Sequence, residues 1–194
     1  MSKAITSRVQ FTFVSVFEKA KQPSGNEEMY EVTLLIDKSD KKTKAALDKA
    51  FEEAIEEGVS KGLLTRADVK SPKFWSPLRD GDEEKPDYDM YKNRWFLKSK
   101  SKFKPQVIDR SGKQLQSDEE FYSGCYGAAS LNAFAYKKAG QMGVSTSLNN
   151  LIKLADGPRM GGAMNAVDEF EEFLDEAGAD QKELLDSIED DSLF

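Results

Sequence analysis

The residues with the clearest chemical potential are the basic side chains of residues 92–113. This stretch holds eight lysines and arginines and a single acid, Asp109. From Lys98 to Lys104, a lysine occupies every second position. On a β-strand, this spacing places the ammonium groups on one face, about 6.5–7 Å apart. Because that distance is close to the repeat of an extended phosphate backbone, the row is predicted to follow a nucleic-acid strand without reading its bases.

Aromatic residues lie within or close to the same basic stretch. A ring stacks on any base with about 1–3 kcal/mol, while lysine and arginine supply the salt-dependent attraction to phosphate. Phe96 and Phe11 are exceptions, because we expect both rings in the core. Basic side chains together with accessible rings are what a binder of single-stranded DNA with little sequence preference needs. The predicted DNA-binding residues are Trp75, Arg79, Tyr88, Tyr91, Lys92, Arg94, Trp95, Lys98, Lys100, Lys102, Phe103, Lys104, Arg110, Lys113, Tyr122 and Tyr126.

Two other functions remain open. The acidic residues of the segment 80–84 would hold Mg²⁺ in a metal-dependent nuclease, but neighbouring acids in a loop are more often simply solvated. The second alternative is an interaction or scaffold module whose basic face meets an acidic protein. Lysines on an edge strand also prevent aggregation without binding anything. We expect no cofactor and no metal ion.

The composition excludes several classes of enzyme. The 194 residues include no histidine, which removes Ser-His-Asp and Cys-His catalysis and argues against a zinc site. Cys125 is the single cysteine, so no intrachain disulfide forms, as suits a reducing cytoplasm. The first residues lack the apolar core of a signal peptide, and no apolar run approaches the roughly 18–20 residues of a membrane helix. We therefore expect neither export nor a membrane partner.

The net charge of −7 is the average of two different regions. Residues 166–194 contain twelve acids and one lysine, a net of −11, which leaves 27 basic and 23 acidic residues in 1–165, a net of +4. Such asymmetry indicates a body that faces nucleic acid and an acidic tail. We therefore divide the chain into a DNA-binding body, 1–165, and an acidic C-terminal tail, 166–194.

The tail has sequence features that a merely solubilising segment does not need. Val167, Phe170, Phe173 and Leu174 predict a short amphipathic helix at its start. Its last residues place apolar side chains after acids, an arrangement that can insert a ring into an apolar pocket with a basic rim. It can also cover the lysines of the body and compete with DNA. The predicted partner-binding residues are Asp190, Asp191, Leu193 and Phe194.

The pattern of the body predicts a mainly β fold. A hairpin is expected from the alternation in 9–17 and 30–36, with a turn over 21–28 and with Val9, Phe11, Phe13 and Phe17 on one face. Ser39 or Asp40 would cap a helix that runs to about Gly58. Residues 68–93 read as an irregular loop. Further strands are expected at 94–98, 106–109, 124–137, where Gly124 and Gly127 permit close backbone approach, and 143–154.

Five or six strands with one helix after the first hairpin suggest a small, partly open barrel. The oligonucleotide/oligosaccharide-binding (OB) fold, a five-stranded barrel, is the leading candidate, with one inserted helix and a helical or disordered acidic tail. The pattern leaves open whether the protein forms a homo-oligomer.

Several segments resemble bacteriophage single-stranded-DNA-binding proteins of a family first catalogued as a domain of unknown function. The resemblance is carried by residues 76–82, 98–102, 121–126, 143–150, 156–157 and 161–162. It implies an OB fold, binding of single-stranded DNA with little sequence preference, and a role in phage DNA replication or recombination in the host cytoplasm. The ending 190–194 is similar to acidic, Phe-terminated tips that recruit replication enzymes.

Overall fold

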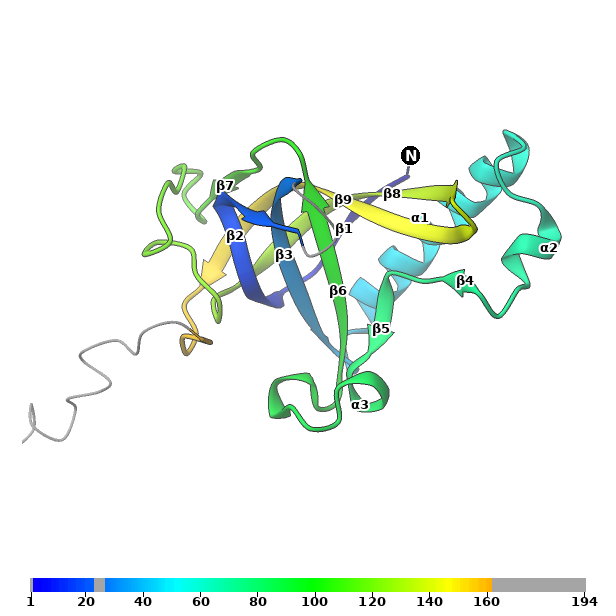
Figure 1. The fold of residues 1–194 in the computed structure, drawn as a ribbon. Coiled ribbons are helices and arrows are strands. Elements are labelled where there is room, and N and C mark those ends of the chain that lie inside the picture. Colours follow the sequence, from blue (N-terminus) through cyan, green and yellow to red (C-terminus); the bar gives the residue numbers. More distant parts are fainter. Residues whose placement is uncertain (1, 23–26, 162–194) are drawn as a thin grey trace, which may run out of the picture. The chain divides into compact units, whose positions relative to one another are not determined.

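The computed structural model describes residues 2–22 and 27–161 (Figure 1). Residues 1–160 form one compact unit, to which all the elements below belong. The predicted turn residues 23–26, the predicted helix with Val167 to Leu174, and the tail residues Asp190, Asp191, Leu193 and Phe194 lie outside the described residues. No helix within 2–22 and 27–161 is long and apolar enough to cross a membrane.

One sheet organises this unit, and five of its strands close into a ring. Around the ring, β8 (Tyr126–Lys138), β2 (Val9–Lys21), β3 (Glu28–Asp37), β6 (Arg94–Ser101) and β9 (Gln141–Ala155) follow one another, and β9 pairs again with β8. The predicted mainly β, OB-like fold is confirmed. The ring is not a regular barrel, because β6 and β9 meet in a single parallel pairing, Lys100 with Ser147.

Short strands extend the ring at its margins and bring the sheet to nine strands in the described residues. β1 (Ser2–Ile5) pairs with β8, and β5 (Leu78–Asp80) pairs with β6. β4 (Phe74–Trp75) and β7 (Gln106–Ile108) both pair with β9. These additions explain why the strand count exceeds the five or six expected from the sequence.

The predicted hairpin is present, but both of its strands extend farther toward the turn than the predicted 9–17 and 30–36, and the side-chain pattern differs at one position. Val9 and Phe11 are buried as expected. Phe13 was predicted on the same face and is exposed instead, with a positive φ of 49°. The pairing with β3 shifts register between Thr12 and Ser15. Because a bulge moves the following side chain off its face, simple alternation fails at this position.

One long helix supports the ring from the side of β1 and β8. α1 (Lys41–Ser60) begins after Asp40, whose carboxylate accepts a hydrogen bond from the backbone N–H of Thr43 at 3.0 Å. Asp40 is one of the two caps that the sequence predicted. Leu47, Ala50 and Ala54 form its buried face, and the helix packs against β8 and β1. α1 therefore covers the buried side of β1 and β8.

Residues 68–93 were predicted as an irregular loop, but short elements lie within this segment and at its start. These are α2 (Arg66–Val69), the strands β4 and β5, α3 (Gly81–Glu84) and the 3-10 turn η1 (Asp89–Tyr91). Each has too few residues for a hydrophobic period to be visible in the sequence. The segment places Trp75 beside the first part of β9, where Trp75 pairs with Gly143.

The predicted close approaches at Gly124 and Gly127 are present. Gly124 has φ of +118°, and a Cβ there would lie 1.9 Å from the carbonyl oxygen of Pro158. A Cβ on Gly127 would lie 1.9 Å from the carbonyl oxygen of Ile152 on β9. Glycine at these two positions therefore lets β8 start close against its neighbours.

Candidate nucleic-acid interface

A groove of about 1260 Å³ lies on the outer side of β6, β9 and β8. It occupies the region where β6 and β9 separate after their single pairing. The β4–β5 segment borders it on one side, and the residues that follow β6 border it on another. This volume exceeds the roughly 300–1,000 Å³ of sites for small molecules, and the groove suits a segment of polymer.

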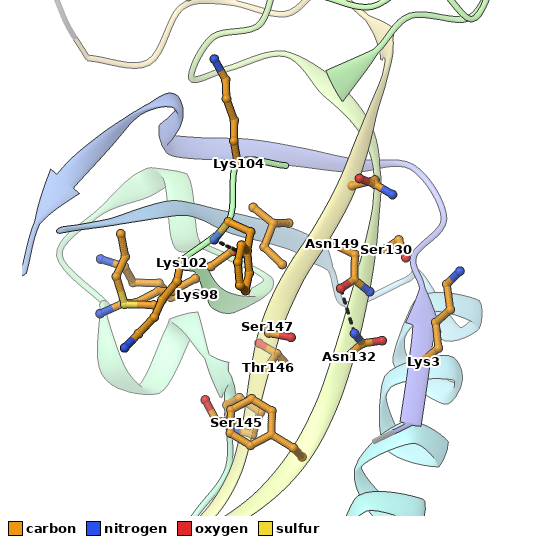
Figure 2. Close-up of a pocket in the computed structure, with 18 of the residues that line it drawn as sticks. Lys3, Lys98, Lys102, Lys104, Ser130, Asn132, Ser145, Thr146, Ser147 and Asn149 are labelled. Carbon is orange, nitrogen blue, oxygen red and sulfur yellow. Dashed lines mark hydrogen bonds between the residues drawn. The ribbon is translucent and has the colours of Figure 1, made fainter. Parts of the chain in front are cut away.

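Polar side chains without formal charge make up the floor of the groove. Alternation on β8 buries Leu131 and Ala133 and turns Asn132 outward, while Ser130 lies on the same side with its hydroxyl covered. Ser145, Ser147 and Asn149 of β9 lie beside them (Figure 2). Asn132 Nδ2 donates a hydrogen bond to Asn149 Oδ1 at 2.8 Å. The floor therefore presents amides and hydroxyls, which suit sugars and base edges, between basic walls.

Lysines stand on both sides of this polar floor. Lys98 and Lys100 project from β6, and Lys102 and Lys104 follow it, while Lys3 of β1 lies on the other side of the floor (Figure 2). All four lysines of the predicted row from Lys98 to Lys104 line the groove. The prediction that they share one strand face is wrong for Lys102 and Lys104, because β6 ends at Ser101.

A buried acid organises two of the lysines. Glu31 Oε1 accepts from Lys98 Nζ at 2.7 Å, and Glu31 Oε2 accepts from Gln22 Nε2 at 2.9 Å. Gln22 Oε1 in turn accepts from Lys100 Nζ. Burial, together with the nearby charge of Lys98, lowers the pKa of Lys100. This chain of contacts fixes the positions of both ammonium groups, and Lys100 lacks a direct carboxylate partner among the described residues.

Aromatic rings and one arginine complete the groove. Trp75 is 45% exposed, and the Arg79 guanidinium lies 4.6 Å from the centre of its ring. Phe103, which is 84% exposed, follows the end of β6. The sequence argument placed Phe96 in the core, and Phe96 is indeed buried, in a small cluster with Leu35 and Tyr91. The groove thus combines free ring surface with cations.

The structure separates the predicted DNA-binding residues into two sets. Seven of them line the groove: Trp75, Arg79, Lys98, Lys100, Lys102, Phe103 and Lys104. Tyr91 is 6% exposed, so its buried ring offers no face for stacking, and this part of the prediction is corrected. The remaining residues lie outside the lining of the groove: Tyr88, Lys92, Arg94, Trp95, Arg110, Lys113, Tyr122 and Tyr126.

Several residues of this second set have other contacts. Trp95 packs partly against the main core, with Lys41 and Lys44 about 5.5 Å and 5.4 Å from its ring centre. Arg94 is paired with Asp37 at 2.9 Å. The Tyr122 hydroxyl donates to Asp156 Oδ1 at 2.8 Å. Lys113 is paired with Glu120 at 3.0 Å. These side chains stabilise the fold locally.

Sequence reasoning missed the other half of the groove. Lys3, Asn132, Phe134, Ser147 and Asn149 all line it and were not among the predicted residues. Asn132 and Phe134 belong to a strand with alternating burial whose outward side chains carry no charge. Their residue types therefore gave no sign of a role in DNA binding. The alternation itself was the available signal, once the strand was known to lie beside the lysines.

The acidic segment 80–84 is occupied by internal contacts. Lys38 Nζ lies 2.6 Å from Asp80 Oδ1 and 2.7 Å from Asp82 Oδ2. Glu84 is paired with Arg79. Within the described part of the chain, no group of three or more Asp, Glu, Cys or His side chains is arranged to hold a metal ion. No observation therefore favours the nuclease alternative.

Comparison with known proteins agrees with this geometry. Residues 2–184 match the family described as "Enterobacter phage Enc34, ssDNA-binding protein". The chain is 38% identical over 112 residues to putative protein p50 of Acyrthosiphon pisum secondary endosymbiont phage 1. That match covers 57% of this chain and 58% of the relative, so it spans little more than half of the relative's length.

Solved structures share the fold at low identity. The single-stranded DNA-binding protein of bacteriophage Enc34 in complex with ssDNA gives a TM-score of 0.67 at 20% identity, over 82% of this chain and 90% of the other. Gp2.5, a single-stranded DNA-binding protein encoded by bacteriophage T7, gives 0.59 at 14% identity, over 85% and 98%. Because the family match covers nearly the whole chain, this protein belongs to the family of the Enterobacter phage Enc34 ssDNA-binding protein.

Proposed function

We propose that this protein binds single-stranded DNA in the groove, with little preference for base sequence. The observation that supports this most strongly is the pairing of two basic walls with exposed rings around a neutral polar floor. Lys98, Lys100, Lys102 and Lys104 contact phosphates from one side, and Lys3 contacts them from the other. Trp75 and Phe103 stack on bases, a contact that every base offers. Duplex DNA keeps its bases stacked inside and gains less from these rings.

The biological role follows from the family and from the acidic segment 166–194. We infer a phage protein that protects single-stranded DNA during replication or recombination in the cytoplasm of the infected host. Asp190, Asp191, Leu193 and Phe194 recruit replication or recombination proteins, and the acids of the tail compete with DNA for the groove lysines. The protein acts as a binder rather than as an enzyme, and assembly of several copies along one strand is compatible with this role.

Titration with labelled poly-dT at several salt concentrations tests the proposal directly. We expect tight binding whose affinity falls steeply as salt rises, because each phosphate contact releases counterions. Binding to duplex DNA of equal charge, measured in parallel, is expected to be weaker. Equal affinity for poly-dT, duplex and heparin would instead support the scaffold alternative, a basic face that binds any polyanion.

Two further measurements examine the remaining alternatives. Incubation of labelled poly-dT with Mg²⁺ is expected to leave the strand intact, whereas cleavage abolished by Asp80→Ala with Asp82→Ala would establish the nuclease. Deletion of residues 180–194 is expected to tighten DNA binding, because a competitor is removed. Weaker binding after the deletion would show that the tail contributes to DNA contact.

A further inference from the structure

The outer face of β8 continues past the end of the groove. Along this strand, Gly127, Ala129 and Leu131 turn inward and are buried, while Tyr126, Ala128, Ser130 and Asn132 alternate with them on the outer face. Ser130 and Asn132 belong to the groove floor, and Tyr126 does not line the groove. Tyr126 therefore lies on the same face as the floor, farther along the strand.

The N-terminal segment runs alongside this part of β8, from Ala133 to Tyr126. In β1, Lys3 pairs with Asn132 and Ile5 pairs with Ser130. Thr6 then donates its backbone N–H to the carbonyl of Ala129 at 3.0 Å. The Arg8 guanidinium lies 4.7 Å from the centre of the Tyr126 ring. A line of side chains, Lys3, Ile5 and Arg8, thus leads from the groove to Tyr126.

These side chains are open to solvent. Ile5 is 60% exposed although it is apolar, and Arg8 is exposed. Neither Lys3 nor Arg8 has a carboxylate partner within the part of the chain that the structure describes. By contrast, Lys44 and Lys49 on α1 face nearby acids, Asp48 and Glu53. The extension therefore carries uncompensated positive charge beside apolar surface, which is the chemistry of a strand of nucleic acid.

The same arrangement of arginine on a ring occurs at the other end of the groove. Arg79 lies over Trp75, which pairs with Gly143 near the start of β9. Arg8 lies over Tyr126, which pairs with Ala155 at the end of β9. A planar guanidinium stacked on a ring leaves its outer face free to stack on an unpaired base. Arg79 is also paired with Glu84, whereas the edges of Arg8 have no carboxylate partner in the described residues and are free to bind phosphate.

We propose that Arg8 and Tyr126 form a second subsite for single-stranded DNA, which extends the path of the strand beyond the groove. The proposal rests on the proposed function, since it concerns the same ligand. Tyr126 is six residues from Asn132 along β8, about 20 Å at 3.3 Å per residue, or roughly three extended nucleotides. Ile5 contacts sugars and bases between the two regions. Only an oligonucleotide longer than the groove reaches this subsite.

Affinity measured at two oligonucleotide lengths tests the subsite. Fluorescence anisotropy with dT5 and dT20 is compared for the full chain and for Arg8→Ala. In Arg8→Ala, we expect the affinity for dT20 to fall about five- to fifty-fold, because the contact with one stacked base and one phosphate is lost. The affinity for dT5 is expected to change less than about twofold. For dT20, the slope of log affinity against log salt is expected to become shallower by about 0.7, which is the value for one lost phosphate contact on a single strand.

The controls separate charge from stacking and from folding. Lys49→Ala removes one exposed charge from α1, at a residue that neither lines the groove nor belongs to the proposed path, and is expected to leave both affinities unchanged. Arg8→Lys keeps the charge and is expected to recover the salt dependence but only part of the affinity for dT20. Arg8→Gln, with thermal unfolding of each variant, keeps the test decisive if Arg8→Ala is unstable.

The outcomes distinguish this proposal from the one it rests on. An equal loss for dT5 and dT20, or no loss for either, overturns the second subsite while DNA binding in the groove stands. Failure of the unaltered protein to bind either oligonucleotide overturns the proposed function itself. A loss confined to dT20 in Arg8→Ala and Arg8→Gln, absent in Lys49→Ala, supports the subsite.

Discussion

Lys98 Nζ lies 2.7 Å from Glu31 Oε1, so one lysine of the groove already has an acidic partner before DNA arrives. The Glu31 side chain is only 12% exposed, and its second oxygen is held by Gln22. A phosphate must therefore compete with Glu31 for Lys98. Lys104 has no carboxylate partner in the described residues and lies over the ring of Phe17 at 5.8 Å. Lys98 and Lys104 lie in the same groove, but the charge of Lys98 is balanced by Glu31 in the free protein and that of Lys104 is not.

We predict that the two lysines contribute unequally to the salt dependence of DNA binding. Lys104→Ala is expected to reduce the slope of log affinity against log salt by about 0.7, the value for one phosphate contact on a single strand. Lys98→Ala is expected to reduce it by clearly less, because Glu31 neutralises Lys98 in the free protein. Titration with poly-dT between low and moderate salt measures both slopes.

Removing the acid provides the control for this prediction. In a Glu31→Gln background, Lys98 lacks its ionic partner, and Lys98→Ala is then expected to reduce the slope as much as Lys104→Ala does. If Lys98→Ala reduces the slope equally in both backgrounds, the ion pair does not limit the contribution of Lys98.

DNA affinity is predicted to depend on pH through Lys100. Burial and the charge of Lys98 lower the pKa of Lys100. This amine therefore loses its proton at a lower pH than an ordinary lysine, whose pKa is about 10.4. A phosphate stabilises the charged form, so affinity is expected to fall as pH rises through the lowered pKa. Binding measured against pH for the unaltered protein and Lys100→Arg tests this, since arginine stays charged. Identical profiles would contradict the assignment to Lys100.

Trp75 is predicted to report DNA binding by its fluorescence and to contribute to affinity. The chain has two tryptophans, of which Trp75 lines the groove and Trp95 packs partly against the core. Trp75→Ala is expected to weaken binding by about 1–3 kcal/mol, roughly five- to 150-fold. Trp75→Phe is expected to abolish quenching by poly-dT while most affinity remains.

The second tryptophan supplies the matched control. Trp95→Phe is expected to keep both the quenching and the affinity, because its ring lies outside the groove beside Lys41 and Lys44. Loss of quenching in Trp95→Phe rather than in Trp75→Phe would mean that DNA passes over a different face of β6.

Stability is predicted to be sensitive at Gly127. A Cβ there would lie 1.9 Å from the Ile152 carbonyl oxygen and 2.7 Å from Phe11 Cε2. Gly127→Ala is expected to destabilise the protein by about 1–3 kcal/mol, as overpacking of a core does. Urea unfolding measures this as a lower midpoint. Ala128→Ser, one residue along β8 on its outer face, is expected to leave the midpoint nearly unchanged, and equal effects of the two would contradict the argument.

Local patterns in the sequence were sufficient for much of the fold. Alternation in 9–17 and 30–36 located the hairpin, and Asp40 with the apolar period of Leu47, Ala50 and Ala54 located α1. These signals arise from contacts within one element or between chain neighbours. They failed where a bulge interrupted alternation, at Phe13, and where elements were too short to show a period, in the predicted loop 68–93.

The sequence by itself determined the chemistry of this protein: a concentration of lysines in 92–113, rings close by, and acids gathered in 166–194. Tertiary structure alone decided which residues meet. Closure of the ring brings β8 and β9 beside β6, so Asn132 and Asn149 form a floor between Lys98 and Lys3. Packing in the fold also buries Tyr91 beside Leu35 and Phe96 and places Trp95 partly against the main core. Pairing between strands distant in the chain depends on packing that no local pattern encodes, and this is why the groove became visible only in the fold.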